Sequence, residues 1–106
     1  MSVKTKRRLA AIVSVDVVGY SRLMGEDESG TLAALRQFRA GLFEPTISEH
    51  RGNIVKSMGD GWLVAFDSAA DAVSCAVETQ EKLSGHDVLK VRIGLHIGDV
   101  IPSGDD

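Results

Sequence analysis

The spacing of apolar and polar residues in the first half of the chain predicts a buried strand followed by an amphipathic helix. Segment 9–18, LAAIVSVDVV, is apolar on both alternations, which is typical of a central strand covered on both faces. In segment 31–50 apolar residues recur at helical spacing, with polar side chains on the other faces. Pro45 lies late in this pattern, so we expect the helix to kink or restart near Glu44.

The second half of the chain predicts a hairpin, a helix and a further strand. Segment 53–66, NIVKSMGDGWLVAF, has two apolar or aromatic runs joined by a short Gly-Asp-Gly turn. Segment 68–83 returns to helical spacing, and Ser68 with Asp71 three residues later resembles a capping box. Segment 88–100 alternates apolar residues with Arg, Gly and His, so we expect a strand with one buried face.

This order of elements favours an α+β fold of ferredoxin-like type, in which two helices cover one face of a mostly antiparallel sheet. Asp16, near the end of the first strand, and Asp60, in the Gly-Asp-Gly turn, then lie at the ends of adjacent central strands. We expect the basic segment 1–8 to be a solvated lead-in and segment 9–106 to form one domain.

Asp16 and Asp60 are the candidate chemical groups of this fold. An ionisable side chain near the end of a buried strand is costly unless it is paired or binds a cation. Two carboxylates that are neighbours in space can hold two divalent cations roughly 3.5–4 Å apart, and oxygen ligands of this kind suit Mg²⁺ or Mn²⁺. The residues therefore predict metal-assisted phosphoryl or nucleotidyl transfer.

Two of these signals also have an ordinary structural interpretation. Gly59 and Gly61 tolerate positive φ and fix the carboxylate between them, but Asp-Gly is also a common hairpin turn without chemical function. Gly19 follows the first strand, where backbone N–H groups can form an anion site before a helix begins. A glycine at a strand end is equally a simple turn residue, so both alternatives stay open.

Composition narrows the class of protein. The chain has 106 residues, of which 43% are hydrophobic and 25% charged, which suffices for one core and argues against disorder. A net charge of −3 gives no reason to expect nucleic acid or an anionic membrane as partner. No apolar run approaches the roughly 18 residues of a membrane span, and the run after the basic segment reaches Asp16 without a signal-peptide cleavage site.

Three further residues have chemical side chains to which we assign structural roles. Cys75 is the single cysteine, which excludes an intramolecular disulfide, fits a reducing, cytoplasmic compartment and predicts a packed residue of its helix. His50 lies at the predicted end of a helix, where a positive charge is favourable, so we do not expect it to be a ligand. His96 lies on the polar alternation of the last strand and is interpreted as a structural or surface residue.

Three segments resemble the catalytic domain of class III adenylate and guanylate cyclases, especially the bacterial branch. They are SVDVVGYSRLMGEDESGTLAALRQF, GNIVKSMGDGWLVAF and VRIGLHIGDV, which follow one another in the family's order and at its intervals. The resemblance runs from about Arg8 to the last residue. It implies the cyclase fold and an enzyme of cyclic-nucleotide signalling that converts ATP to cyclic AMP and pyrophosphate, through attack of the 3′-hydroxyl on the α-phosphate.

The resemblance also implies roles for individual residues. Asp16 and Asp60 match the two aspartates that bind the pair of Mg²⁺ or Mn²⁺ ions, and the backbone carbonyl of Val17 matches a further metal ligand. Lys56, four positions before the second aspartate, matches the lysine that helps select adenine, and Asp106 matches its usual companion. The amides that bind the triphosphate fall on Val18, Gly19 and Tyr20.

The sequence departs from the family's pattern at its last residues. Family members continue with a helix carrying an asparagine and an arginine, which orient the ribose and stabilise the transition state. This sequence stops at Asp106 before such residues, so we expect a C-terminally truncated domain that is inactive alone. The family forms head-to-tail dimers with composite sites, which implies a homodimer.

Two other functions stay open. The chain could be a catalytically silent module for nucleotide binding or dimerisation, which the absent asparagine and arginine favour. It could also be a different two-aspartate transferase on a similar sheet. Lys56 and the segment GLHIGD argue against that transferase, because they have no evident role in it.

Overall fold

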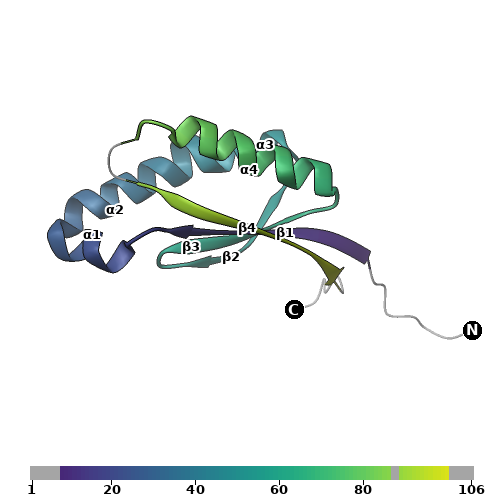
Figure 1. The fold of residues 1–106 in the computed structure, drawn as a ribbon, viewed down its shortest axis with the longest axis horizontal. Helices are drawn as coiled ribbons and strands as arrows, with labels where there is room; N and C mark the ends of the chain where they lie inside the picture. The colour runs from purple at the N-terminus through teal and green to yellow at the C-terminus, as the bar shows by residue number, and fades with distance from the viewer. Residues whose placement is uncertain (1–7, 87–88, 101–106) are drawn as a thin grey trace, which may run out of the picture.

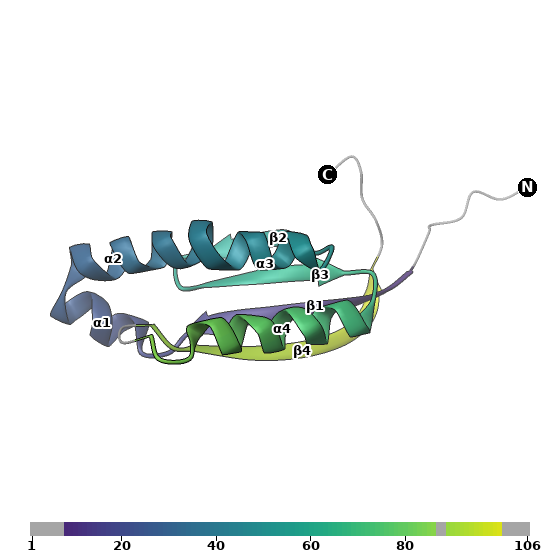
Figure 2. The same ribbon diagram turned by 90° about the horizontal axis from the view of Figure 1, so that it is seen from above.

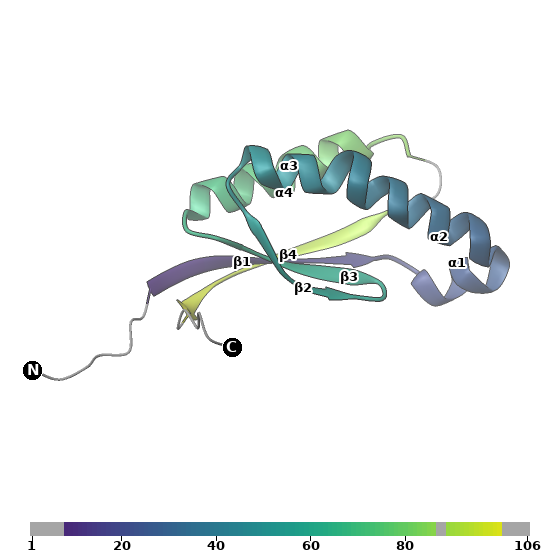
Figure 3. The same ribbon diagram turned by 180° about the vertical axis from the view of Figure 1, so that it is seen from behind.

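The computed structural model describes residues 8–86 and 89–100 of the chain. Four strands form one antiparallel sheet in the order β2-β3-β1-β4, and the longer helical segments lie on one face of it, while the short first helix lies beyond the end of the strands (Figures 1 and 3). The elements are β1 (Arg8–Val17), α1 (Tyr20–Glu26), α2 (Glu28–Gln37), the π-helix η1 (Phe38–Phe43), α3 (Glu44–Glu49), β2 (Asn53–Met58), β3 (Gly61–Phe66), α4 (Ala69–Leu83) and β4 (Val91–Val100). The predicted α+β architecture is confirmed.

The two predicted helical segments, which correspond to α2–α3 and α4, cover different halves of the sheet. Figure 2 shows α2 and α3 beside β2 and β3, and α4 beside β1 and β4. Alternate residues of β1 and β3 point into this layer and form the core. They are Ala11, Val13, Val15, Val17, Trp62, Val64 and Phe66.

The opposite face of β1 differs from the sequence-based expectation. We expected a strand covered on both faces, but Ile12 and Ser14 are only partly buried and Asp16 is exposed. In the described part of the chain no helix covers the other face of the sheet, so the alternate residues of β1 look out from it. That uncovered face is called the helix-free face below.

The long helical segment is continuous but changes its winding before Pro45. Pro45 has no N–H to donate to the carbonyl of Gly41, and the residues just before α3 adopt the wider π-helix geometry. Phe38 and Phe43, five positions apart, therefore stack with ring centroids 5.1 Å apart, and both contact Trp62 at 5.6 and 5.4 Å. The change that we expected near Glu44, a kink or a restart, takes the form of this π-helical stretch, after which α3 begins at Glu44.

Side-chain caps fix where two helices begin. Asp27 accepts a hydrogen bond from the amide of Gly30 at 3.0 Å, which starts α2 three residues earlier than the apolar pattern indicated. Ser68 accepts from the amide of Asp71 at 3.2 Å, so the predicted cap of α4 is confirmed. β4 begins at Val91, whereas its predicted first residue, position 88, lies outside the described residues.

Candidate functional site

The end of β1 brings Asp16 and the turn that carries Asp60 together. Asp16 pairs with Gly61, the residue after Asp60, in the antiparallel ladder between β1 and β3. The amide of Val17 donates a hydrogen bond to the carbonyl of Asp60 at 2.9 Å, which ties the turn to the strand end. Two acids separated by 44 positions in sequence, 16 and 60, are therefore neighbours, as the sequence predicted.

Gly61 makes room for the Asp16 carboxylate. A Cβ atom added to Gly61 would lie 2.7 Å from Oδ1 of Asp16 and 2.6 Å from the carbonyl oxygen of Val15. Real Cβ atoms do not approach other atoms this closely, so any side chain at position 61 would displace the acid or the strand. The absence of a side chain there leaves space for the Asp16 carboxylate beside the turn that carries Asp60. The donor set, two carboxylates and the nearby carbonyl of Val17, consists of the hard oxygen ligands that Mg²⁺ and Mn²⁺ prefer.

The strand register arranges the helix-free face in rows across the sheet. The row that contains Asp16 consists, from β2 to β4, of Met58, Gly61, Asp16 and Arg92. The next row runs Lys56, Leu63, Ser14, Gly94. Lys56 and Asp16 thus lie on the same face, two strands and one row apart, or roughly 12 Å between backbones on standard strand spacings.

Arg92 is a site residue that the sequence analysis did not select. It lies directly opposite Asp16 in the ladder between β1 and β4 and is exposed on the helix-free face. In the sequence it belonged only to the polar alternation of the last strand. Arg92 can be selected only when it is known that β4 pairs with β1 and in which register. The alternation of apolar and polar residues within β4 alone does not give this pairing.

The β1–α1 junction has the geometry of a tight turn. Gly19 adopts φ 67°, a left-handed conformation that favours glycine, and α1 starts at Tyr20. The amide of Val18 donates to the carbonyl of Lys90 at 2.8 Å, so it is engaged inside the protein. Gly19 and Tyr20 remain the candidates for phosphate contacts through backbone amides, and a contact from the Val18 amide would require this bond to open.

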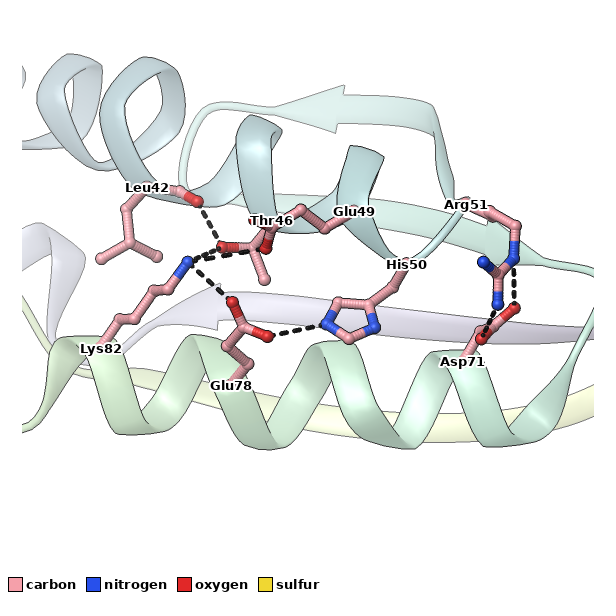
Figure 4. Close-up of polar contacts among 8 residues, drawn as sticks. All are labelled: Leu42, Thr46, Glu49, His50, Arg51, Asp71, Glu78 and Lys82. Carbon is pink, nitrogen blue, oxygen red and sulfur yellow. Dashed lines mark hydrogen bonds and ion pairs between the residues drawn. The ribbon is translucent and has the colours of Figure 1, made fainter.

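A second group of possible ligands lies in the helix layer, far from the acids at the sheet end. Glu49, His50 and Glu78 place ligand atoms within 4.8 Å of one another. Figure 4 shows that Lys82 shares this space: its Nζ lies 2.8 Å from Oε2 of Glu78, and 3.1 Å from the hydroxyl of Thr46, to which it donates. The ammonium group already supplies the positive charge, so this cluster is an ion-pair network between α3 and α4.

Hydrogen bonds in that network lower the pKa of the Glu78 carboxyl group. The bonds from Lys82 and then from His50, whose Nε2 lies 2.8 Å from Oε1 of Glu78, lower the pKa of Glu78 from 4.5 to about 2. His50 is thus the C-cap of α3 and a partner of Glu78, which agrees with its predicted structural role. Burial raises the pKa of the Cys75 thiol, which favours the uncharged, packed residue that the sequence predicted.

Three predictions from the sequence remain: the roles of Asp106 and His96, and the absence of a membrane span. Asp106 lies outside the described residues. His96 is exposed on the helix-free face, as predicted, and its Nε2 lies 3.0 Å from where a Cβ of Gly98 would stand. None of the helices in residues 8–86 and 89–100 is both long and apolar enough to cross a bilayer.

Comparison with known proteins places this geometry in a family. "Putative adenylate cyclase 3" of Rhizobium meliloti is 38% identical over 108 residues, which covers 95% of this chain and 18% of that protein. The crystal structure of an adenylate/guanylate cyclase/hydrolase from Silicibacter pomeroyi matches with a TM-score of 0.84 and 38% identity, over 95% of this chain and 63% of that one. The guanylyl cyclase Cya2 matches with a TM-score of 0.76 and 26% identity, over 98% of this chain and 63% of that one.

These matches have two limits. No protein-family model matches the chain. The chain also spans less than two thirds of the solved relatives and under a fifth of the curated one, so they describe a region and not a whole protein. Within that region, the antiparallel sheet and the helix layer agree with the cyclase catalytic fold. The chain therefore belongs to the class III adenylate and guanylate cyclase catalytic domains.

Proposed function

We propose that this chain is part of an adenylate cyclase catalytic domain, which converts ATP to cyclic AMP and pyrophosphate. The observation that carries the proposal is the neighbourhood of Asp16 and the Asp60 turn at one end of the helix-free face. The relatives include both adenylate and guanylate cyclases by name. The preference for ATP rests on Lys56 and on the name of the Rhizobium meliloti relative.

Asp16 and Asp60 would hold two divalent cations, Mg²⁺ or Mn²⁺, with the carbonyl of Val17 as an additional oxygen ligand. When bound, such a pair activates the 3′-hydroxyl and neutralises charge on the phosphates. The protein would contribute by positioning the two acids. The hydrogen bond between Val17 and Asp60 and the absence of a side chain at Gly61 would keep them beside each other before substrate binds.

Arg92 would bind phosphate oxygens next to the metal pair. Its place opposite Asp16 puts a permanent positive charge beside the acids, and guanidinium groups bind phosphate through paired N–H donors. The amides of Gly19 and Tyr20 at the start of α1 would add neutral donors. Together these groups would hold the triphosphate at the acidic end of the helix-free face.

Lys56 would contact the purine. It lies on the same face as the acids but one row further along and two strands away, so it is separated from the phosphates by a nucleoside-sized gap. Its ammonium group donates hydrogen bonds only, which suits the N1 acceptor of adenine. Asp106 would be its companion.

A homodimer with composite sites would cover the helix-free face. Ile12 and Leu63 are partly buried there without helices above them, and exposed Met58 lies in the same row as Asp16. A second molecule over this face would shield these side chains and bring its own residues to the acidic end of the face. A module that binds nucleotide without turnover remains the other candidate.

Binding of Mn²⁺ and of ATP in its presence tests the proposal on the chain itself. Asp16→Asn and Asp60→Asn are each expected to abolish Mn²⁺-dependent ATP binding, measured by electron paramagnetic resonance of Mn²⁺ and by calorimetry, while circular dichroism stays unchanged. Glu81→Gln, which removes an exposed carboxylate from α4, is the matched control and should bind as the unmodified chain does.

Turnover tests the reaction. In a protein that carries this chain with the rest of a cyclase domain, manganese and ATP should give cyclic AMP, and GTP should give less cyclic GMP. Loss of fold in both aspartate variants would make the acids structural. Nucleotide binding without any cyclic product in the complete domain would favour the silent module.

A further inference from the structure

The side chain of Arg22, in the first turn of α1, folds back over the junction between β1 and α1. A Cβ atom added to Gly19 would lie 3.0 Å from Nη2 of Arg22 and 3.6 Å from both its Cζ and its Nε. The guanidinium group therefore covers the side of Gly19 from which a side chain would project. The glycine, which also has the left-handed φ of 67°, leaves room for this group directly beside the backbone.

Arg22 has a loose partner in Glu26, one turn later on α1. Nη1 of Arg22 lies 3.6 Å from Oε1 of Glu26, which is too long for a hydrogen bond, and both side chains are 64% exposed. Exposed ion pairs between positions i and i+4 of a helix contribute little to stability. The guanidinium group can therefore exchange the Glu26 carboxylate for a more highly charged ligand at small cost.

The junction lies on the path that a bound triphosphate would follow from the acids. In the proposed reaction the metal pair at Asp16 and Asp60 would act on the α-phosphate, because the 3′-hydroxyl attacks there. The amides of Gly19 and Tyr20, three and four positions after Asp16, are the candidates for the phosphates beyond it. Figure 1 shows α1 beyond the end of β1, so the chain leads from the acids toward Arg22. The phosphate nearest to Arg22 would then be the terminal one.

A cavity beside Arg22 has room for a phosphate group. Its volume is about 500 Å³, and it lies between α1, α2 and Lys90, the residue before β4. Lys90 adds a second cationic side chain to its wall. Glu26 and Asp27 also line the cavity, but Asp27 is engaged as the cap of α2 and Glu26 is the loose partner of Arg22. The two cationic side chains are therefore available to an anionic ligand.

We propose that Arg22 is a further phosphate-binding residue of this site and that it binds the terminal phosphate of a nucleoside triphosphate. The inference rests on the proposed function and deepens it, because it names a residue that selects triphosphates over diphosphates. A guanidinium group binds phosphate through two parallel N–H donors and keeps its charge at physiological pH. With Arg92 beside the acids and Arg22 at the junction, each end of the triphosphate meets an arginine.

Calorimetric binding of ATP and of ADP in the presence of Mn²⁺ tests this role. Arg22→Gln is expected to lower the affinity for ATP at least about tenfold and the affinity for ADP much less, because a charge-assisted bond to the terminal phosphate is lost. Arg22→Lys keeps the charge but not the planar pair of donors, so its ATP affinity should be intermediate. The affinity for Mn²⁺ alone should not change in either variant, because Arg22 is not assigned to the metal pair.

Glu26→Gln is the matched control, because it breaks the same exposed ion pair from the other side. It removes a competing carboxylate, so the affinity for ATP should stay the same or rise by up to about twofold. Equal losses of ATP affinity in Arg22→Gln and Glu26→Gln, or equal losses for ATP and ADP in Arg22→Gln, would overturn the proposal. Unchanged ATP binding in Arg22→Gln would contradict this inference alone, whereas no ATP binding by the unmodified chain would contradict the proposed function as well.

Discussion

Asp16 on β1 and Arg92 on β4 lie directly opposite each other in the antiparallel ladder, both exposed on the helix-free face. The pair places an acid that we assign to metal binding beside a side chain that stays positively charged at any physiological pH. A site for a polyphosphate with bound cations needs both signs of charge within a few ångströms. The relationship comes from strand pairing and links two of the three segments that resemble the cyclase family.

Arg92→Gln is expected to weaken binding of ATP with Mn²⁺ at least about tenfold, because a charge-assisted hydrogen bond to phosphate is worth about 1.5–3 kcal/mol. Binding of Mn²⁺ alone should not weaken, since the arginine repels a cation. Calorimetry of the chain with each ligand measures both quantities. Arg36→Gln, at an exposed position on α2, is the control, and equal effects of the two substitutions would remove Arg92 from the site.

Gly61→Ala is expected to abolish Mn²⁺ binding, because its Cβ would occupy space within 2.7 Å of the Asp16 carboxylate. Overpacking of this kind typically costs about 1–3 kcal/mol of folding stability, so the variant should unfold at lower urea concentration but remain folded in buffer. Electron paramagnetic resonance and urea titration separate the two effects. Gly25→Ala meets no atom within 4 Å and should retain Mn²⁺ binding; normal Mn²⁺ affinity in Gly61→Ala would mean that Asp16 does not need this space.

Much of the architecture could be predicted from the sequence because the local signals agree with the global fold. The cap at Ser68, the restart near Glu44 and the Gly-Asp-Gly turn each depend on contacts within a few residues. Asp16 and Asp60 could be placed together because each lies at the end of an element whose neighbours follow from an antiparallel order. Fixed geometry over short distances is what a sequence pattern encodes best.

The parts that could not be predicted depend on register. Strict alternation in β2 would put Ile54 and Lys56 on the same side of the sheet, but the shift between them sends Ile54 toward the helices and Lys56 to the helix-free face. Arg92 was missed for a related reason, because its partner depends on which strand lies beside β4. The expectation that β1 is covered on both faces was wrong because its apolar run does not show on which side the helices pack.

Lys56→Glu is expected to weaken ATP binding at least about tenfold and GTP binding less. The ammonium donor matches N1 of adenine, and a site built for one hydrogen-bond pattern leaves its polar groups unpaired with the other base. Competition of the two nucleotides in the presence of Mn²⁺ measures the ratio of their dissociation constants. Arg36→Gln, which removes an exposed positive charge from α2, should not change that ratio. Equal losses for ATP and GTP would return Lys56 to a surface role.

The Glu78 network is expected to make stability depend on pH in the acidic range. Because the pKa of Glu78 is lowered from 4.5 to about 2 in the folded chain, its contribution is present above pH 4.5 and is lost as the pH falls toward 2. Glu78→Gln removes the charge that Lys82 and His50 share, so it should destabilise the chain at pH 7 and have almost no effect near pH 2. Urea unfolding of both proteins across this range measures the difference. Glu28→Gln, an exposed acid in the first turn of α2, should show a smaller change with pH, and a constant difference between Glu78→Gln and the unmodified chain would mean that the network contributes through packing and not through charge.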